Sequence, residues 1–151
     1  DHHGIVANSF WDPERKEVYK MNKPATRNDA SYYGGEPIWV TAQKQGIKTG
    51  NVYWVGSDIA VKGEHPTYYQ VYDKKPRLSQ TERVAEVLRM LRLPEADRPQ
   101  LVMLYFEDSD TYGHTYSPFS QETRKCIARL DALMRFLWEG LQSLPFAKRS
   151  T

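Results

Sequence analysis

The stretch Leu101-Val-Met-Leu-Tyr-Phe106 decides the fold class of this 151-residue chain. It is a short run of apolar and aromatic residues without polar alternation, which is typical of a strand buried on both faces of a parallel sheet. Parallel strands need long crossover connections, and these are usually helices. The run therefore predicts an α/β fold with a mostly parallel sheet and helices on both faces.

Helix signals flank this run on both sides. Before it, Ser79 and Glu82 have the spacing of a capping box, and apolar residues follow at helical intervals, which predicts a helix from Ser79 to about Leu93. After it, residues 107–118 are polar and are predicted to form a loop. A second long helix is predicted from Ser120 to about Leu141, with an apolar face that we expect to lie against the core: Ile127, Leu130, Met134, Leu137 and Leu141, with Cys126 as an inert core thiol on the same face.

The N-terminal half carries further strand and helix patterns. The apolar run Gly4–Phe10 predicts a strand that ends at a turn, and a short strand is expected near Val18-Tyr19. A helix is predicted over Glu36–Gln45, where a proline suits the first turn and a glycine follows the last. Ile47–Val55 predicts another strand, and residues 56–78 predict a loop rich in Gly, Pro and Tyr. The alternation of strands and helices supports the parallel α/β architecture.

Length and composition exclude several classes of protein. The chain has the length of a single domain, residues 1–151, and its net charge of +2 is too small for binding to a nucleic-acid duplex. No apolar stretch approaches the roughly 20 residues of a membrane span. The single cysteine excludes an internal disulfide framework and a zinc site made of several thiolates. Aromatic residues make up 13% of the chain, and tyrosine is frequent in ligand clefts that are half wet and half apolar.

The polar stretch that follows the 101–106 run is the best candidate for chemistry. Ligands of α/β proteins collect beyond the carboxyl ends of strands, where this stretch begins. Asp110 and His114 lie four residues apart there, and a carboxylate oxygen with an imidazole nitrogen is a reasonable half-site for zinc or manganese. The alternative is a solvated acidic loop with a chance histidine. A second histidine cluster, Asp1-His2-His3, is more simply explained as loop residues.

Aromatic residues near the strand ends form a second candidate feature. Bases stack on such rings, although ordinary packing explains most aromatic residues. The sequence contains no glycine-rich phosphate loop and no Gly-x-Ser-x-Gly nucleophile elbow, so no complete catalytic set emerges from the residues alone. The aromatic residues in question are Trp54, Tyr68, Tyr69, Tyr72 and Tyr105.

Read from end to end, the chain resembles the central part of the nucleotide pyrophosphatase/phosphodiesterase family, the type I phosphodiesterases of the alkaline-phosphatase superfamily. The resemblance covers nearly all residues in the right order, and two blocks, Gly-Glu-Pro-Ile-Trp and Asp-x-x-Gly-His, are distinctive together. The matching segments are His3–Asn8, Asp12-Pro13, Gly34–Ala42, Tyr53–Asp58, Arg83-Val84 and Leu104–His114.

This resemblance implies a fold, an activity and a set of site residues. The fold would be part of an alkaline-phosphatase-like core, and the activity would be hydrolysis of phosphodiester or pyrophosphate bonds of a nucleotide with two zinc ions and a Thr or Ser nucleophile. Asp110 and His114 would bind one zinc ion, and Asn8 would donate a hydrogen bond to a phosphate oxygen. Tyr72 and Tyr105 would flank the base, with Trp54 nearby. Family members usually act outside the cytoplasm, so the resemblance implies an extracytoplasmic location.

The chain also departs from the family pattern. The family carries its nucleophile and further metal ligands before the His-Gly-Ile segment and after the helix that corresponds to Ser120–Leu141. We therefore expect a partial domain that lacks turnover by itself. Ser109 and Val55 stand where prolines are usual, and Ser117 stands where glycine is usual and strains a turn. The alternatives are a non-catalytic remnant that binds nucleotide or metal, a sulfatase-like or phosphonate-cleaving relative, and a plain α/β interaction domain.

Overall fold

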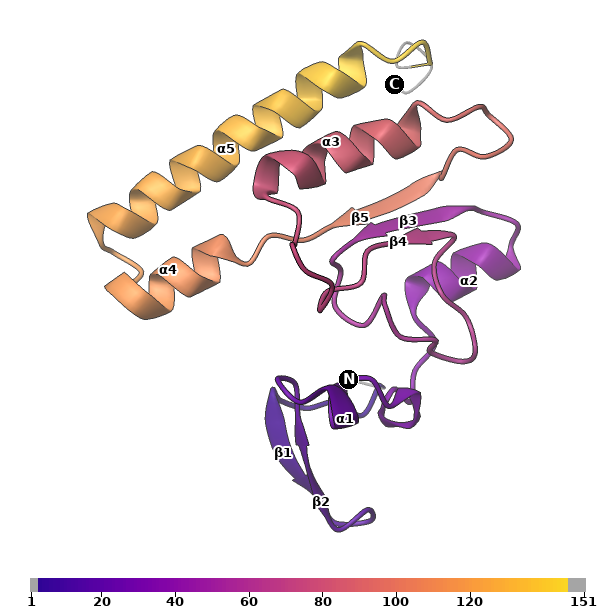
Figure 1. Ribbon diagram of the computed structural model, residues 1–151, viewed down its shortest axis with the longest axis vertical. Helices are drawn as coiled ribbons and strands as arrows, with labels where there is room; N and C mark the ends of the chain where they lie inside the picture. Colours follow the sequence, from indigo (N-terminus) through magenta and orange to yellow (C-terminus); the bar gives the residue numbers. More distant parts are fainter. Residues whose placement is uncertain (1–2, 147–151) are drawn as a thin grey trace.

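A parallel three-stranded sheet lies at the centre of the computed structural model, which describes residues 3–146 (Figure 1). Strand β3 (Thr49–Val52) pairs in parallel with β4 (Tyr68–Tyr69) on one side and with β5 (Leu101–Leu104) on the other. All residues of β3 are buried, but those of β5 are only partly buried because β5 is an edge strand among the described residues. The expectation that the 101–106 run is buried on both faces is therefore wrong.

Helices cover both faces of this sheet, as predicted. Helix α3 (Gln80–Leu91) packs on one face, where Val52 joins Val87 and Met90 in the buried core. Helix α2 (Ile38–Lys44) packs on the other face, where the Thr49 hydroxyl donates a hydrogen bond of 2.7 Å to Gln43 Oε1. The α/β class with helices on both faces is thus confirmed.

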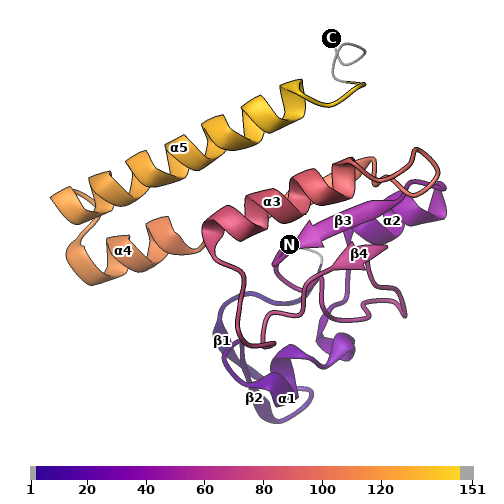
Figure 2. The ribbon, with the colours of Figure 1, turned by 45° about the horizontal axis from the view of Figure 1, so that its top comes forward.

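The long helix α5 (Gln121–Gln142) forms a further layer outside α3 (Figures 1 and 2). The two helices approach so closely that a Cβ atom on Gly140 would lie 2.5 Å from Leu88 Cδ1. Only glycine fits there without displacing Leu88, which is itself buried.

The predicted helices around the sheet are present. The capping box of α3 forms as expected: Ser79 Oγ accepts from the backbone N–H of Glu82, and the Glu82 carboxylate accepts from the backbone N–H of Ser79. These two contacts satisfy N–H groups that the first helical turn leaves without partners. Because they need specific residues at a fixed spacing, the start of α3 could be predicted from the sequence.

The first predicted strand, Gly4–Phe10, is misplaced. Strand β1 begins only at Ser9 (Ser9–Asp12) and pairs antiparallel with β2 (Glu17–Lys20), so it forms a hairpin apart from the parallel sheet. The reason is the turn after β1, where Asp12 Oδ1 accepts from the backbone N–H groups of Glu14 and Arg15 and reverses the chain. The third strand of the parallel sheet is instead β4, within residues predicted as a loop.

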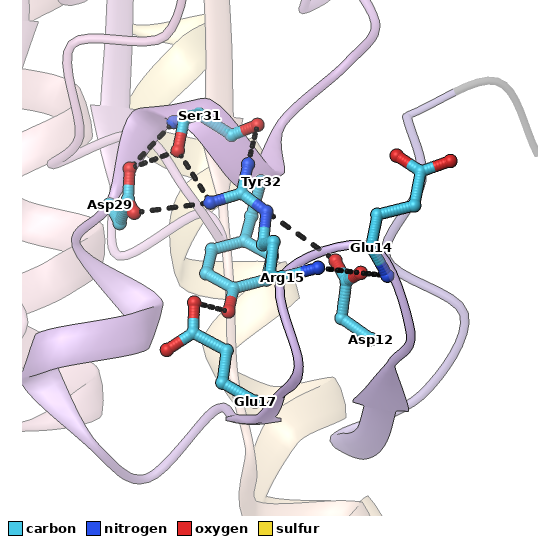
Figure 3. Close-up of polar contacts among 7 residues, drawn as sticks. All are labelled: Asp12, Glu14, Arg15, Glu17, Asp29, Ser31 and Tyr32. Carbon is cyan, nitrogen blue, oxygen red and sulfur yellow. Dashed lines mark hydrogen bonds and ion pairs between the residues drawn. The ribbon is translucent and has the colours of Figure 1, made fainter.

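Arg15 anchors this hairpin to the rest of the N-terminal segment (Figure 3). Its guanidinium donates to Ser31 Oγ (2.9 Å) and to the Ser31 carbonyl oxygen (2.8 Å), and it lies 4.0 Å from the centre of the Tyr32 ring. Ser31 and Tyr32 belong to the short 3-10 helix η1 (Ala30–Tyr32), which follows α1 (Pro24–Arg27). The contacts hold the hairpin, and with it the residues that precede β1, in one position.

The stretch 107–118 is a helix, α4 (Asp108–Tyr116), and not the predicted loop. Its carboxylates Asp108 and Asp110 lie in the first turn, where the partial positive charge of a helix N-terminus stabilises them. Helix α4 packs against α5, where Arg129 lies 5.3 Å from the centre of the Tyr112 ring. Tertiary contact with α5 thus supports a helix that has little apolar periodicity of its own.

The apolar face predicted for the last helix is also only partly correct. Cys126 is buried, as predicted, and Leu137 packs against the core, but Ile127 and Met134 are 52% and 41% exposed. The described part of α5 lies on α3 and α4 and not on the sheet, so its contact with them buries only a narrow stripe of the helix.

Ser117 adopts the strained backbone that its departure from the family pattern predicted. At φ +83° and ψ 142° it ends α4 in a region that only glycine enters easily. We expect Ser117→Gly to stabilise the chain by about 1 kcal/mol, because relief of the strain exceeds the greater flexibility of glycine in the unfolded chain. Thermal denaturation should show a rise in Tm of about 2–4 °C.

A matched control for this substitution is Ser143→Gly. Ser143 also follows a helix but has an ordinary φ of −78°, so glycine there should leave Tm unchanged or lower it. An unchanged or lower Tm in Ser117→Gly would contradict the assignment of strain.

Candidate functional site

A cavity of about 270 Å³ opens at the carboxyl ends of β3 and β5. It brings together four of the residues singled out in the sequence, Asn8, Trp54, Tyr72 and Tyr105, which come from four separate segments of the chain. Its complete lining is Asn8, Met21, Arg27, Tyr53, Trp54, Val55, Gly56, Asp58, Tyr72 and Tyr105.

The turn after β3 builds one wall of the cavity. Tyr53 has a left-handed backbone (φ +57°), which bends the chain sharply away from the strand, and Trp54 and Val55 follow. The Tyr53 hydroxyl accepts a hydrogen bond of 3.0 Å from the backbone N–H of Leu78. This bond connects the turn to the segment that leads into α3. The wall is therefore fixed by β3 on one side and by this hydrogen bond on the other.

Tyr72 is fixed from several directions. Its backbone N–H donates to Asp58 Oδ2 at 3.0 Å, and its ring forms a T-shaped pair with the Tyr53 ring at a centroid distance of 5.8 Å. Arg77 lies over the ring, with its guanidinium carbon 4.1 Å from the ring centre. The ring is therefore a supported platform beside the cavity.

Tyr105 extends β5 toward the cavity. Its backbone N–H donates to the Val52 carbonyl oxygen at 3.1 Å, which continues the ladder between β5 and β3. Burial, and then the negative charges of Glu107 and Asp110, raise the pKa of the Tyr105 phenol. The phenol is therefore neutral at physiological pH and can act as a hydrogen-bond donor.

Two charged residues of the lining were not identified from the sequence. Arg27 forms an ion pair with Asp73, and Asp58 lies close enough for its charge to act on Arg27. Burial alone would lower the pKa of Arg27, but its hydrogen bond to the Asp73 carboxylate and the charges of Asp73 and Asp58 raise it. Asp58 is the last residue of the Tyr53–Asp58 segment that resembles the family. Arg27 lies in a stretch without helical or strand periodicity, and no sequence motif marked it as a site residue.

Asn8 owes its place to the hairpin. It lies directly before β1, and its carbonyl oxygen accepts from the backbone N–H of Met21, which follows β2, at 2.8 Å. Met21 also lines the cavity. The Arg15 contacts that hold the hairpin therefore also hold this edge of the cavity.

Asp110 and His114 lie on the same side of α4, one turn apart. His114 Nε2 and Asp110 Oδ1 are 3.4 Å from each other, and both side chains are exposed. They line a separate open hollow and not the aromatic cavity. One oxygen and one nitrogen donor fit part of a zinc site, but residues 3–146 contain no group of three or more potential ligands that could hold a metal ion.

The alternative histidine cluster at the N-terminus receives no support. Asp1 and His2 lie outside the described residues, and His3 is exposed, with its Nδ1 accepting from the backbone N–H of Ile5 at 3.1 Å. Within residues 3–146, no helix is long and apolar enough to cross a membrane.

A buried arginine joins the aromatic cavity to α4. Arg83 is 2% exposed; it donates to the Tyr105 carbonyl oxygen (2.9 Å) and forms a bidentate ion pair with Glu107, the residue directly before α4. The Arg83 hydrogen bonds hold the pKa of Glu107 below its usual value against the opposing effect of burial. The same guanidinium therefore positions the end of β5 and the start of the helix that carries Asp110 and His114.

Comparison with known proteins gives consistent matches. A profile described as type I phosphodiesterase / nucleotide pyrophosphatase matches residues 1–149. The chain is 38% identical over 142 residues to ectonucleotide pyrophosphatase/phosphodiesterase family member 1 of Homo sapiens, and 39% identical over 140 residues to a venom phosphodiesterase of Naja atra. These alignments cover 94% and 93% of the chain but only 15% and 16% of the relatives.

A solved structure also matches the fold. Murine ectonucleotide pyrophosphatase/phosphodiesterase 5, in an inactive form in complex with AMP, superposes with a TM-score of 0.83 at 30% sequence identity. The match covers 97% of this chain and 37% of that one, so the chain corresponds to a part of the solved protein.

Proposed function

Because the chain belongs to the type I phosphodiesterase / nucleotide pyrophosphatase family, we propose that its aromatic cavity binds a nucleotide within a phosphodiesterase domain of alkaline-phosphatase-like fold. One observation carries the proposal: Asn8, Trp54, Tyr72 and Tyr105 converge on one cavity beyond the carboxyl ends of the parallel strands. Ligands of open α/β sheets bind in this position. A structural relative in complex with AMP supports the same ligand class.

The rings of the cavity would bind the base. Stacking of a base on an aromatic side chain contributes about 1–3 kcal/mol and needs no particular base sequence. Tyr72 and Tyr105 would supply the stacking surfaces, with Trp54 beside them. The Asn8 amide would donate a hydrogen bond to a phosphate oxygen and stabilise the charge that develops there during phosphoryl transfer.

Zinc is part of the proposal, with Asp110 and His114 as two of its ligands. Their oxygen and nitrogen ligand atoms lie 3.4 Å apart on α4 and are exposed, so they could supply two of the ligands of a zinc site. A bound zinc ion would supply Lewis-acid chemistry at the phosphoryl oxygens. The remaining ligands would have to come from outside residues 3–146, since the described part contains no group of three or more potential ligands. We propose that the nucleophile also lies outside them, as the family resemblance implies. We therefore propose hydrolysis as the activity of the complete domain, in an extracytoplasmic location as the family resemblance implies.

The second candidate is a non-catalytic remnant that binds nucleotide or metal. One feature favours it: the strained Ser117 departs from the family pattern at the end of the helix that carries Asp110 and His114. Nucleotide binding is common to both candidates, so it is the property to test first.

Calorimetric titration with AMP tests the proposed cavity. We expect the chain to bind AMP and Tyr72→Leu to bind it roughly 5- to 100-fold more weakly, because leucine keeps the bulk but removes the stacking face. Tyr116→Leu is the matched control, since Tyr116 is an exposed tyrosine of α4 that does not line the cavity, and its affinity should not change. Absence of AMP binding in the wild type, or equal affinity in Tyr72→Leu, would exclude the cavity as a nucleotide site.

A further inference from the structure

Arg77 lies against Tyr72, one of the residues that line the proposed nucleotide cavity. Its guanidinium carbon lies 4.1 Å from the centre of the Tyr72 ring, which places the group over one face of that ring. Tyr72 lines the cavity, whereas Arg77 is not among the lining residues found within 3–146. The arginine therefore contacts a ring of the cavity wall without itself lining the cavity.

The guanidinium is held there mainly by stacking. Its Nε atom is buried and has no hydrogen-bond partner in the described part of the chain. The negative charges of Asp73 and Glu107 lie near enough for Arg77 to contribute to lowering the pKa of both carboxyl groups. These charges keep the cation in place, and a planar guanidinium over a tyrosine ring is an attractive arrangement.

Tyr72 needs such support because of where it lies. It follows β4 in an irregular segment with many exposed residues and has no regular backbone ladder to hold its ring. The Tyr53 ring packs against Tyr72 in a T-shaped arrangement, and Arg77 lies over one face of the Tyr72 ring. A ring held by two neighbours keeps a fixed orientation beside the cavity, which lowers the entropy lost when a base stacks on it.

We propose that Arg77 is a positioning residue for base recognition. It acts on the base through the Tyr72 ring and makes no contact with the phosphate of the nucleotide. The inference rests on the proposed function of the cavity. Arg77 should therefore affect ligands that carry a base and leave ligands without a base unaffected.

The test compares AMP with ribose 5-phosphate, each titrated into the chain by NMR, which measures weak binding. We expect Arg77→Ala to weaken AMP binding roughly 3- to 10-fold, the size of one cation–π contact, and to leave ribose 5-phosphate binding unchanged. Arg77→Lys should give an intermediate AMP affinity, since lysine keeps the charge but lacks the planar group. Lys74→Ala is the control, because it removes one positive charge from an exposed position in the same loop.

The outcomes distinguish the role of Arg77 from nucleotide binding by the cavity. Wild-type AMP binding with an unchanged AMP affinity in Arg77→Ala overturns the role of Arg77 and leaves the nucleotide site standing. An equal loss for AMP and ribose 5-phosphate also overturns it, because that result indicates a direct contact with phosphate. Absence of AMP binding in the wild type overturns both. If Arg77→Ala does not fold, Arg77→Lys alone decides, since an AMP affinity equal to that of the wild type contradicts a need for the planar group.

Discussion

Replacing Arg83 with methionine should lower the Tm of the chain by roughly 5–15 °C. Arg83 is the most buried charged residue among residues 3–146: it is 2% exposed and bonds to Glu107 and to the carbonyl oxygens of Leu78 and Tyr105. Methionine has a similar shape and helix propensity, so the substitution removes mainly the charge and the hydrogen bonds. It leaves two carbonyl oxygens and one carboxylate without their partner.

Breaking a buried ion pair from one side costs about 3–5 kcal/mol. We expect about 2–4 kcal/mol here, because the Glu107 side chain is 28% exposed and can recover part of its hydration. Arg89→Met is the matched control: Arg89 lies on the same helix and pairs with Glu86, but its side chain is 57% exposed, so the change should stay within about 0.5 kcal/mol. Equal Tm values for the two variants would contradict the structural role of Arg83.

The pH dependence of this stabilisation follows from Glu107. Its pKa is lower in the folded chain than the ordinary value of 4.5, so the pair stabilises the fold fully above that value and loses its effect as the pH falls through the lowered pKa. The difference in Tm between the wild type and Arg83→Met should therefore shrink as the pH is lowered from about 5 to about 3.

Replacing Asp110 with asparagine should weaken zinc binding at least about 10-fold. The substitution keeps the shape of the side chain but removes the negative charge from one of the two donors on α4. Calorimetric titration of zinc into the wild type and the variant measures the effect, and the difference between the two isolates the α4 pair from other histidines of the chain. Binding should also weaken at acid pH, because imidazole binds metal only in its neutral form.

Asp131→Asn provides the control for the charge change. Asp131 is exposed on α5 and does not line the hollow that contains Asp110 and His114, so its substitution should leave zinc affinity unchanged. Equal affinities in wild type, Asp110→Asn and Asp131→Asn would remove the α4 pair from the proposed zinc site.

The two halves of the site differ in how far they were predictable. The pairing of Asp110 with His114 follows from their spacing, since residues four apart face each other on a helix, although the segment was predicted as a loop. Four cavity residues were predicted from the family resemblance, but no role was predicted for Arg27, which also lines the cavity, or for the buried Arg83. An arginine looks the same in a sequence whether it is solvated or buried against a carboxylate that lies 24 residues away in the chain.

Local patterns by themselves determined α2, α3, α5 and the two longer strands of the parallel sheet, because capping residues, helical spacing and apolar runs act within one or two turns of chain. Strand β2, predicted near Val18-Tyr19, closes a local hairpin with β1. Tertiary structure decided the rest. The short strand β4 and helix α4, in contrast, depend on β3 and α5, and the cavity exists only where four separate segments meet. The energy that selects these elements comes from contacts between segments, and no window of sequence contains both sides of such a contact.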